Sequence, residues 1–291
     1  MKRHFFPILF LAALAAVRLS APAAETEPAR HPGIAELRLV SDATAIRPGE
    51  TIVLGLFFRH EPKFHTYWKS PGIVGVGALI EWKDLPPGFE PGDSLWPGPL
   101  TTKMAQLTAY GYETDTCILF PMKTPKAVEG DAVTFKAHVG WMACATTCHP
   151  GWHDFELTLP VSREGDPPPI DAKWRKVFDE TRARVPKPAP EGWRFAAEHD
   201  GERVIRLKVT PPAGAAPIDP AKVYFFCDDW QVDSDSPQKP GPIDPKDGGF
   251  TIELVHPKYA PEDPKSFSGV LYSPDGWPGF DRPWMRLAID W

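Results

Sequence analysis

The sequence predicts an all-β fold, in which an antiparallel β-sandwich is followed by a second, smaller β-domain with a short linker helix between them. The 36 prolines among 291 residues disfavour long helices and favour short strands separated by turns. Several stretches alternate apolar and polar residues, which is the period of a half-buried strand. One internal stretch has helical spacing instead, and it separates the two groups of strands.

The predicted strands of the first half alternate, or are apolar throughout. The segments "IAELRLV" (34–40), "TFKAHV" (134–139) and "DFELTLP" (154–160) place apolar side chains on one face and polar side chains on the other. The segment "TIVLGLFF" (51–58) predicts a more fully buried strand. About seven such strands before residue 165 indicate an antiparallel sandwich.

A linker with one helix follows the first group of strands. The proline-rich segment "REGDPPPI" (163–170) predicts the linker. The segment "DAKWRKVFDETRAR" (171–184) predicts a helix, because Trp174 and Phe178 share one face and Asp171 can cap its first turn.

Strands resume after the helix, in segments such as "VIRLKV", "FTIELV" and "WMRLAID". These segments predict the second β-domain. The expected division of the chain is a signal peptide (1–24), a first β-domain with the cysteine pair (25–164), a linker with a short helix (165–191) and a second β-domain (192–291).

The N-terminus has the pattern of a secretory signal peptide. Lys2 and Arg3 precede an apolar stretch from Phe5 to Val17, and small residues at 21–24 suit cleavage. The apolar stretch is too short to cross a membrane. We therefore expect a soluble periplasmic or secreted protein after cleavage, in a compartment where disulfides persist.

The charge of the chain argues against nucleic acid as a partner. The formal net charge is −6, and removal of 1–24 takes away three basic residues. An acidic chain without a basic run lacks the electrostatic footprint of a nucleic-acid-binding protein.

The segment "GWMACATTCHPGW" (140–152) holds Cys144 and Cys148. Small residues between them allow a tight turn, so we expect both thiols near the surface where a strand ends, with Trp141 at the base. Closing so small a loop stabilises a fold little, which favours a pair that exchanges over a structural staple. Because the thiolate is the reactive form, a protonated His149 beside the pair would favour reaction.

Two other interpretations remain open at this stage. The thiols of Cys144 and Cys148, with His149 or Met142, would suit the soft ion Cu(I), which makes a copper-binding or copper-tolerance protein the alternative. The bridge could also be a passive staple in a non-catalytic interaction module.

The remaining cysteines are expected to be small buried residues. Cys117 lies in the apolar run "TCILFP" and Cys227 in "YFFCDDW". The acidic Asp228 and Asp229 disfavour a thiolate at Cys227. Pairing of Cys117 with Cys227 is left open.

Four segments lie in a characteristic order: "FHTYWKSPG" (64–72), "LPPGFEPGDSLWPGP" (85–99), "YGYE" (110–113) and "GWMACATTCHPG" (140–151). Together they resemble the N-terminal periplasmic domain of DsbD-type thiol:disulfide interchange proteins, especially the copper-sensitivity-suppressor branch. The segment "KVYFFCDDWQVDSDSPQ" (222–238) resembles the second β-domain of that branch.

The resemblance implies an immunoglobulin-like sandwich with Cys144 and Cys148 as its redox pair, and no cofactor unless copper binds. The implied activity is that of a protein-disulfide reductase component. The implied partners are periplasmic thioredoxin-fold proteins and a separate membrane electron donor. Tyr67 and Trp68 are expected to shield the pair. The C-x3-C spacing departs from the wider spacing of the best-known members.

Overall fold

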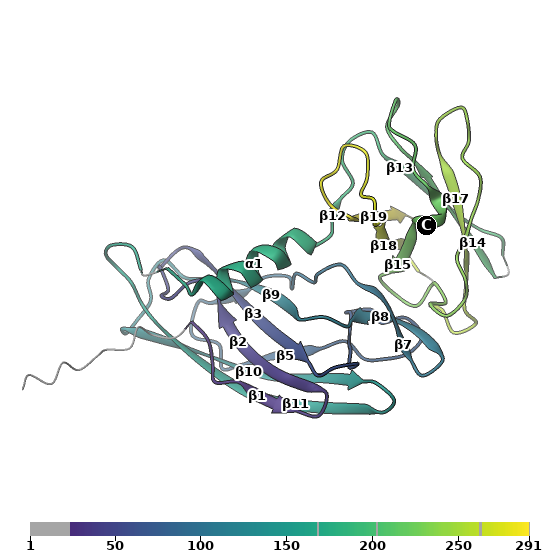
Figure 1. The fold of residues 1–291 in the computed structure, drawn as a ribbon. Helices are drawn as coiled ribbons and strands as arrows, with labels where there is room; N and C mark the ends of the chain where they lie inside the picture. The colour runs from purple at the N-terminus through teal and green to yellow at the C-terminus, as the bar shows by residue number, and fades with distance from the viewer. Residues whose placement is uncertain (1–23, 168, 202, 262–263, 291) are drawn as a thin grey trace, which may run out of the picture.

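A computed structural model describes residues 24–167, 169–201, 203–261 and 264–290. Nearly all of the predicted signal peptide lies outside the described residues. Figure 1 shows two groups of β-strands joined by one helix, α1 (Ala172–Arg184). The prediction of an all-β fold with a short linker helix is confirmed.

The first group of strands forms three antiparallel sheets. The largest has the order β1-β2-β3-β9-β6, with β1 (Ala29–His31), β2 (Ile34–Ser41), β3 (Thr51–His60), β9 (Thr116–Lys123) and β6 (Glu90–Pro91). The second has the order β11-β10-β5, with β11 (Cys148–Pro160), β10 (Ala132–Cys144) and β5 (Leu79–Lys83). The third has the order β4-β8-β7, with β4 (Thr66–Tyr67), β8 (Leu107–Tyr112) and β7 (Leu100–Met104). The two larger sheets share a core that includes Leu39, Leu56, Phe135 and Leu157.

The second group of strands forms two sheets around a separate core. One has the order β12-β19-β18-β15, with β12 (Lys187–Pro188), β19 (Trp284–Asp290), β18 (Ser266–Tyr272) and β15 (Tyr224–Cys227). The other has the order β13-β14-β17-β16, with β13 (Arg194–His199), β14 (Val204–Thr210), β17 (Phe250–Val255) and β16 (Lys239–Pro240). A 3-10 turn, η1 (Pro220–Lys222), precedes β15.

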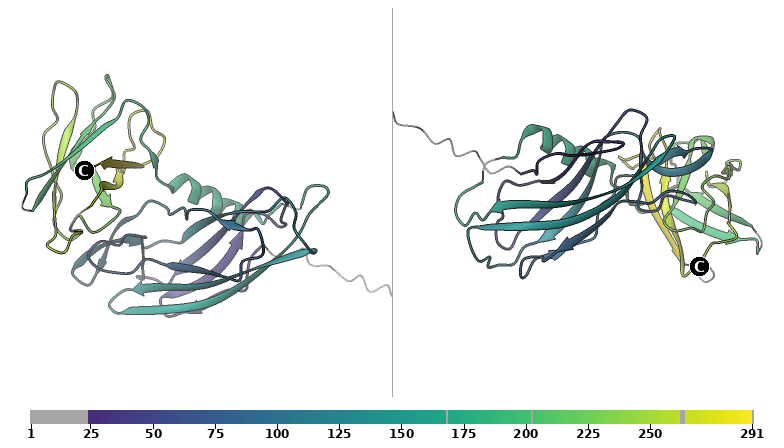
Figure 2. Two further views of the ribbon diagram at one scale, coloured as in Figure 1. Left: turned by 180° about the vertical axis from the view of Figure 1, so that it is seen from behind. Right: turned by 90° about the horizontal axis from the view of Figure 1, so that it is seen from below.

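Helix α1 covers the outer face of the five-stranded sheet (Figure 2). The Asp171 side chain accepts a hydrogen bond from the Lys173 backbone N–H at 2.7 Å, as the sequence predicts for an N-cap. Trp174 and Phe178 are buried against Phe57 of β3. The apolar stripe of the helix therefore fixes its position on the sheet.

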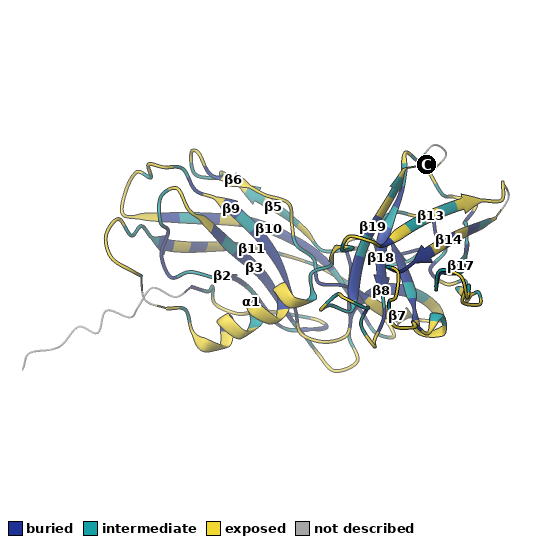
Figure 3. Cartoon of the chain, turned by 90° about the horizontal axis from the view of Figure 1, so that it is seen from above, coloured by how far each residue is buried: buried dark blue, intermediate teal, exposed yellow. Residues whose placement is uncertain are grey.

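The third sheet of the first group lies beside the second group (Figure 3). Trp68 and Tyr110 of the first group pack in one cluster with Phe226, Val270 and Trp284 of the second. The indole N–H of Trp284 donates to the Pro99 carbonyl at 2.9 Å. The two groups are thus in direct apolar contact at the β4 end of the sandwich.

Candidate redox site

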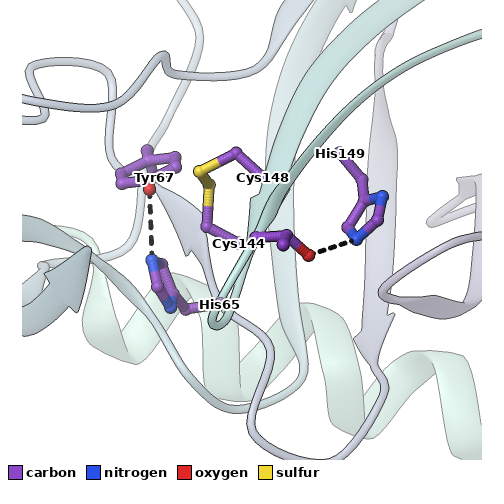
Figure 4. Close-up of a disulfide and its surroundings, with 6 residues drawn as sticks. His65, Tyr67, Cys144, Cys148 and His149 are labelled. Carbon is purple, nitrogen blue, oxygen red and sulfur yellow. Dashed lines mark hydrogen bonds between the residues drawn. A yellow bond between two sulfur atoms is a disulfide. The ribbon is translucent and has the colours of Figure 1, made fainter. Parts of the chain in front are cut away.

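The hairpin β10–β11 brings the two cysteines opposite each other. Its register runs without a break from Ala132 opposite Pro160 to Cys144 opposite Cys148. The turn between the cysteines is closed by the Ala145 N–H, which donates to the Thr147 carbonyl at 3.0 Å. The Cα atoms of Cys144 and Cys148 are 4.1 Å apart, and the two residues form a disulfide (Figure 4).

Packing beneath the hairpin supports its end. Trp141 points into the core of the sandwich, where its ring meets His31 and Phe58 edge-on. Opposite Trp141 stands Gly151, and a Cβ there would lie 2.4 Å from the Trp141 ring. The tryptophan and the glycine together hold the two strands close below the disulfide.

The two cysteines differ in exposure. Cys148 is exposed, whereas Cys144 is 0 % exposed. The expectation that both thiols lie near the surface is therefore wrong for Cys144. The reason is a long-range contact: the backbone of His65 forms two hydrogen bonds with that of Cys144, at 2.9 and 3.0 Å, and Tyr67 and Ala109 pack against its side chain.

A neutral pair of rings lies beside the disulfide. His65 Nε2 and the Tyr67 hydroxyl are 3.2 Å apart, and Figure 4 shows both rings beside the cysteines. Burial lowers the pKa of His65, although Glu113 acts in the opposite direction. Burial also raises the pKa of Tyr67 to about 12. Near pH 7 both side chains are uncharged, so they present dipoles to the sulfurs.

The residues predicted from the sequence to surround the cysteine pair fall into two sets: some lie at the disulfide and the others lie elsewhere. Tyr67 lies at the disulfide, and Met142 packs against the cluster of Tyr67, Ala109 and Cys144. Trp68 instead faces the second group of strands, and Trp141 lies in the sandwich core.

His149 is turned away from the disulfide. Figure 4 shows its ring on the far side of the hairpin, where Nε2 lies 3.0 Å from the Thr147 hydroxyl. Its ring packs near Phe64 instead. The alternation of the strand explains this, because His149 follows Cys148 and so faces the opposite side.

Sequence reasoning missed His65, Ala109, Val74 and Met104, all of which lie at or around the Cys144 cluster. A signal for His65 was present in "FHTYW", since it is two residues before Tyr67 and shares its face in an extended chain. The other three depend on contacts between distant segments.

The other cysteines are free thiols in separate clusters. Cys117 is buried beneath α1, and Cys227 is buried in the core of the second group. Burial raises the pKa of both thiols, and the charge of Asp229 adds to the effect at Cys227. Neither thiol is suited to exchange.

Exposed apolar side chains lie on the outer face of the hairpin, the face that also carries Cys148. Gly140 stands between Leu79 of β5 and Trp152 of β11 in the sheet. Leu79 is 63 % exposed and Trp152 is 60 % exposed. A Cβ on Gly140 would lie 3.3 Å from the Trp152 ring, so the indole lies against the sheet.

Within the described part of the chain, no group of three or more His, Cys, Asp or Glu side chains is placed to hold a metal ion. None of the helices in the described ranges is long and apolar enough to cross a membrane.

Comparison with known families finds a match for the first group of strands. Residues 36–160 match the family model described as "Thiol:disulfide interchange protein DsbD, N-terminal". The first domain matches the DsbD N-terminal family. The match supports a thiol:disulfide interchange module, and it spans the hairpin that carries the Cys144–Cys148 disulfide.

Solved structures extend the likeness beyond the DsbD N-terminal region. The N-terminal periplasmic domain of ScsB from Proteus mirabilis aligns with 92 % of this chain and 99 % of its own, at 18 % identity and a TM-score of 0.62. This likeness shows a shared fold across both groups of strands. The conserved domain protein from Bacillus anthracis covers 91 % of this chain and 88 % of its own, at 10 % identity and a TM-score of 0.26. That score is too low to support an argument. The comparison with curated proteins found no match.

Proposed function

We propose that this protein is an exported thiol:disulfide exchange module whose reacting groups are Cys144 and Cys148. The observation that carries the proposal is an exposed and a buried cysteine joined at the tip of a hairpin, inside a domain that matches the DsbD N-terminal family. The difference in exposure supports a separate role for each cysteine. Cys148 exchanges with the partner, and Cys144 resolves the mixed disulfide.

Loading with electrons begins when a donor thiolate attacks the Cys148 sulfur. The Cys144–Cys148 bond breaks, a donor–Cys148 disulfide forms, and Cys144 leaves as a thiolate that takes up a proton. The second thiol of the donor then attacks the donor sulfur in the mixed disulfide and releases Cys148. The donor leaves oxidised, and this chain has gained two electrons and two protons.

Delivery is the reverse sequence. The Cys148 thiolate attacks a disulfide of the acceptor and forms a mixed disulfide. Cys144 then attacks the Cys148 sulfur, restores the internal bond and releases the acceptor as a dithiol.

The partners follow from the location and the chemistry. The signal-peptide pattern at 1–24 and the likeness to a periplasmic ScsB domain support a periplasmic protein. The electron donor is a separate membrane protein, and the acceptors are periplasmic thioredoxin-fold proteins.

The proposal divides the chain into a first domain (25–164), a linker (165–191) and a second domain (192–291). The separate cores of the two groups of strands, with α1 between them, support these limits. The first domain then contains the whole redox pair.

A trapping experiment tests the assigned roles. The reduced variants Cys144→Ser and Cys148→Ser are mixed with a thioredoxin that keeps one active-site cysteine, activated as a mixed disulfide with thionitrobenzoate, and protein–protein disulfides are counted by mass spectrometry. Cys144→Ser should accumulate a complex through Cys148, and Cys148→Ser should not. The double variant is the control for Cys117 and Cys227. Equal trapping by both single variants would refute the roles, and absence of any complex would refute the function.

The reduction potential gives a second test of the function. Equilibration in glutathione buffers should give a value of roughly −180 to −270 mV, the range of proteins that exchange disulfides. A value below about −300 mV would indicate a structural disulfide and favour the passive interaction module.

One observation favours copper binding as a second candidate. Met104 and Met142 both pack against the cluster that holds Cys144, so the reduced site would combine two thiolates with thioether sulfur. Reduced protein should then bind Cu(I), and Met142→Leu should weaken the binding. Unchanged affinity in Met142→Leu and in Cys148→Ser would remove this candidate.

A further inference from the structure

Residues 67–77 form a loop, here called the covering loop, whose two ends lie at the redox site. Tyr67 packs against Cys144, and Val74 packs against the same cluster. A Cβ on Gly75 would lie 2.3 Å from the Tyr67 ring, so the chain at Gly75 lies directly on that ring. The returning part of the loop therefore holds Tyr67 in place beside the disulfide.

The first part of the covering loop is bonded to strand β8 through the backbones of Trp68 and Tyr110, and it also contacts the second domain. Trp68 packs in the cluster that contains Phe226 and Trp284, with its ring centroid 6.5 Å from that of Phe226. Lys69 Nζ lies 2.7 Å from a carboxylate oxygen of Asp228. The next residue, Ser70, donates its hydroxyl to the Asp228 carbonyl.

The next part of the loop is held by Ser234, a buried residue of the second domain. Its hydroxyl accepts a hydrogen bond from the Ile73 N–H at 3.0 Å and donates one to the Thr108 carbonyl at 2.7 Å. Gly72 has φ +86°, and a Cβ there would lie 2.3 Å from the Ser234 oxygen. This hydroxyl thus joins the loop, strand β8 and the second domain at one point.

The contact with the disulfide and the contact with the second domain are made by two neighbouring residues of the loop. Successive side chains of an extended segment face opposite sides, so Tyr67 meets the disulfide while Trp68 meets the second domain. Loss of the contacts on the Trp68 side would therefore leave the loop less restrained and Tyr67 less firmly held against the sulfurs.

We infer that the second domain positions the covering loop, chiefly through Ser234 and Asp228, and thereby limits the access of thiols to the Cys144–Cys148 disulfide. This inference rests on the proposed function and gives the second domain a role in it. Ser234 is a positioning residue, since it acts through the loop and does not touch the sulfurs.

The test is the rate at which dithiothreitol reduces the disulfide of the full chain. Ser234→Ala removes both hydrogen bonds of the hydroxyl, and the rate should rise by about tenfold as the loop opens more often. The matched control is Ser41→Ala, which removes a buried hydroxyl that accepts the Ala43 N–H in the first domain. Both variants should lose stability, but only Ser234→Ala should react faster.

Lys69→Gln is a second variant that keeps the core intact, because Lys69 is exposed. It weakens the contact with Asp228 and should raise the rate by about twofold, with the difference from wild type shrinking at high salt. Wild-type rates in both variants would overturn the inference, even if Ser234→Ala proved unstable. Because dithiothreitol is not a protein partner, this result is independent of exchange with thioredoxin, which tests the proposed function.

Discussion

At the scale of single residues, the support beneath the disulfide depends on Gly151. Gly151→Ala would place a Cβ 2.4 Å from the buried ring of Trp141, which is fixed in the core. We expect a loss of about 1–3 kcal/mol in the free energy of unfolding, the usual cost of overpacking, measured by urea denaturation. Gly140→Ala is the control, because its Cβ would meet the exposed Trp152, which can move aside. An equal loss in both variants would contradict this account.

His60 couples pH to the strand that carries Tyr67. Its Nε2 lies 2.9 Å from the Thr66 hydroxyl of β4, and burial lowers its pKa from 6.5 to about 4. Between pH 6.5 and 4 the unfolded chain therefore binds a proton that the folded chain excludes, so the free energy of unfolding decreases as the pH is lowered. At pH 4 the loss due to His60 reaches about 3 kcal/mol. Urea titrations should show a flatter fall in His60→Gln, and parallel curves for the two proteins would contradict the assignment.

At the scale of elements, the local sequence pattern was enough to predict the long strands and the helix. Alternation predicted β2, β10 and β11, and spacing with a cap predicted α1. Strand β4 has only two residues, and no periodic signal exists at that length. Its position beside β10 depends on contacts across almost eighty residues of sequence, which also bury Cys144. The cysteine pair was therefore predictable, but the asymmetry between its two sulfurs was not.

The outer face of the β10–β11 hairpin is expected to contact the exchange partner. Trp152 lies on the same face as Cys148, four residues along β11, and is 60 % exposed. A thioredoxin-fold partner that brings its sulfur to Cys148 would cover this ring. Trp152→Ala should therefore slow exchange with thioredoxin by about tenfold, since buried tryptophans dominate interfaces.

The matched control for this prediction is Trp230→Ala, which removes a 56 % exposed tryptophan in the second domain. It should exchange with thioredoxin at the wild-type rate. Reduction by dithiothreitol should be unchanged in both variants. A faster reaction with dithiothreitol in Trp152→Ala would mean that the ring supports the hairpin instead of a partner.

At the scale of the whole molecule, the two domains meet through aromatic side chains that the sequence could not assign to an interface. Trp68, Tyr110 and Trp284 are each compatible with an ordinary core, and only the folded chain shows that they share one cluster between domains. The indole N–H of Trp284 and the Pro99 carbonyl add a hydrogen bond across the contact. Burial of large aromatic rings is the dominant attraction here, so we expect the domains to unfold together.

Trp284→Ala should separate the unfolding of the two domains. The loss of a buried tryptophan typically costs about 3–5 kcal/mol, and here much of it would fall on the interface. Calorimetry should show one transition for the wild type and two for Trp284→Ala. Trp193→Ala is the control, because Trp193 is also 8 % exposed but packs inside the second core. It should lower the transition of the second domain alone. A single unbroken transition in Trp284→Ala would show that the domains are coupled by other contacts, of which the covering loop and its bonds to Ser234 and Asp228 are the next to test.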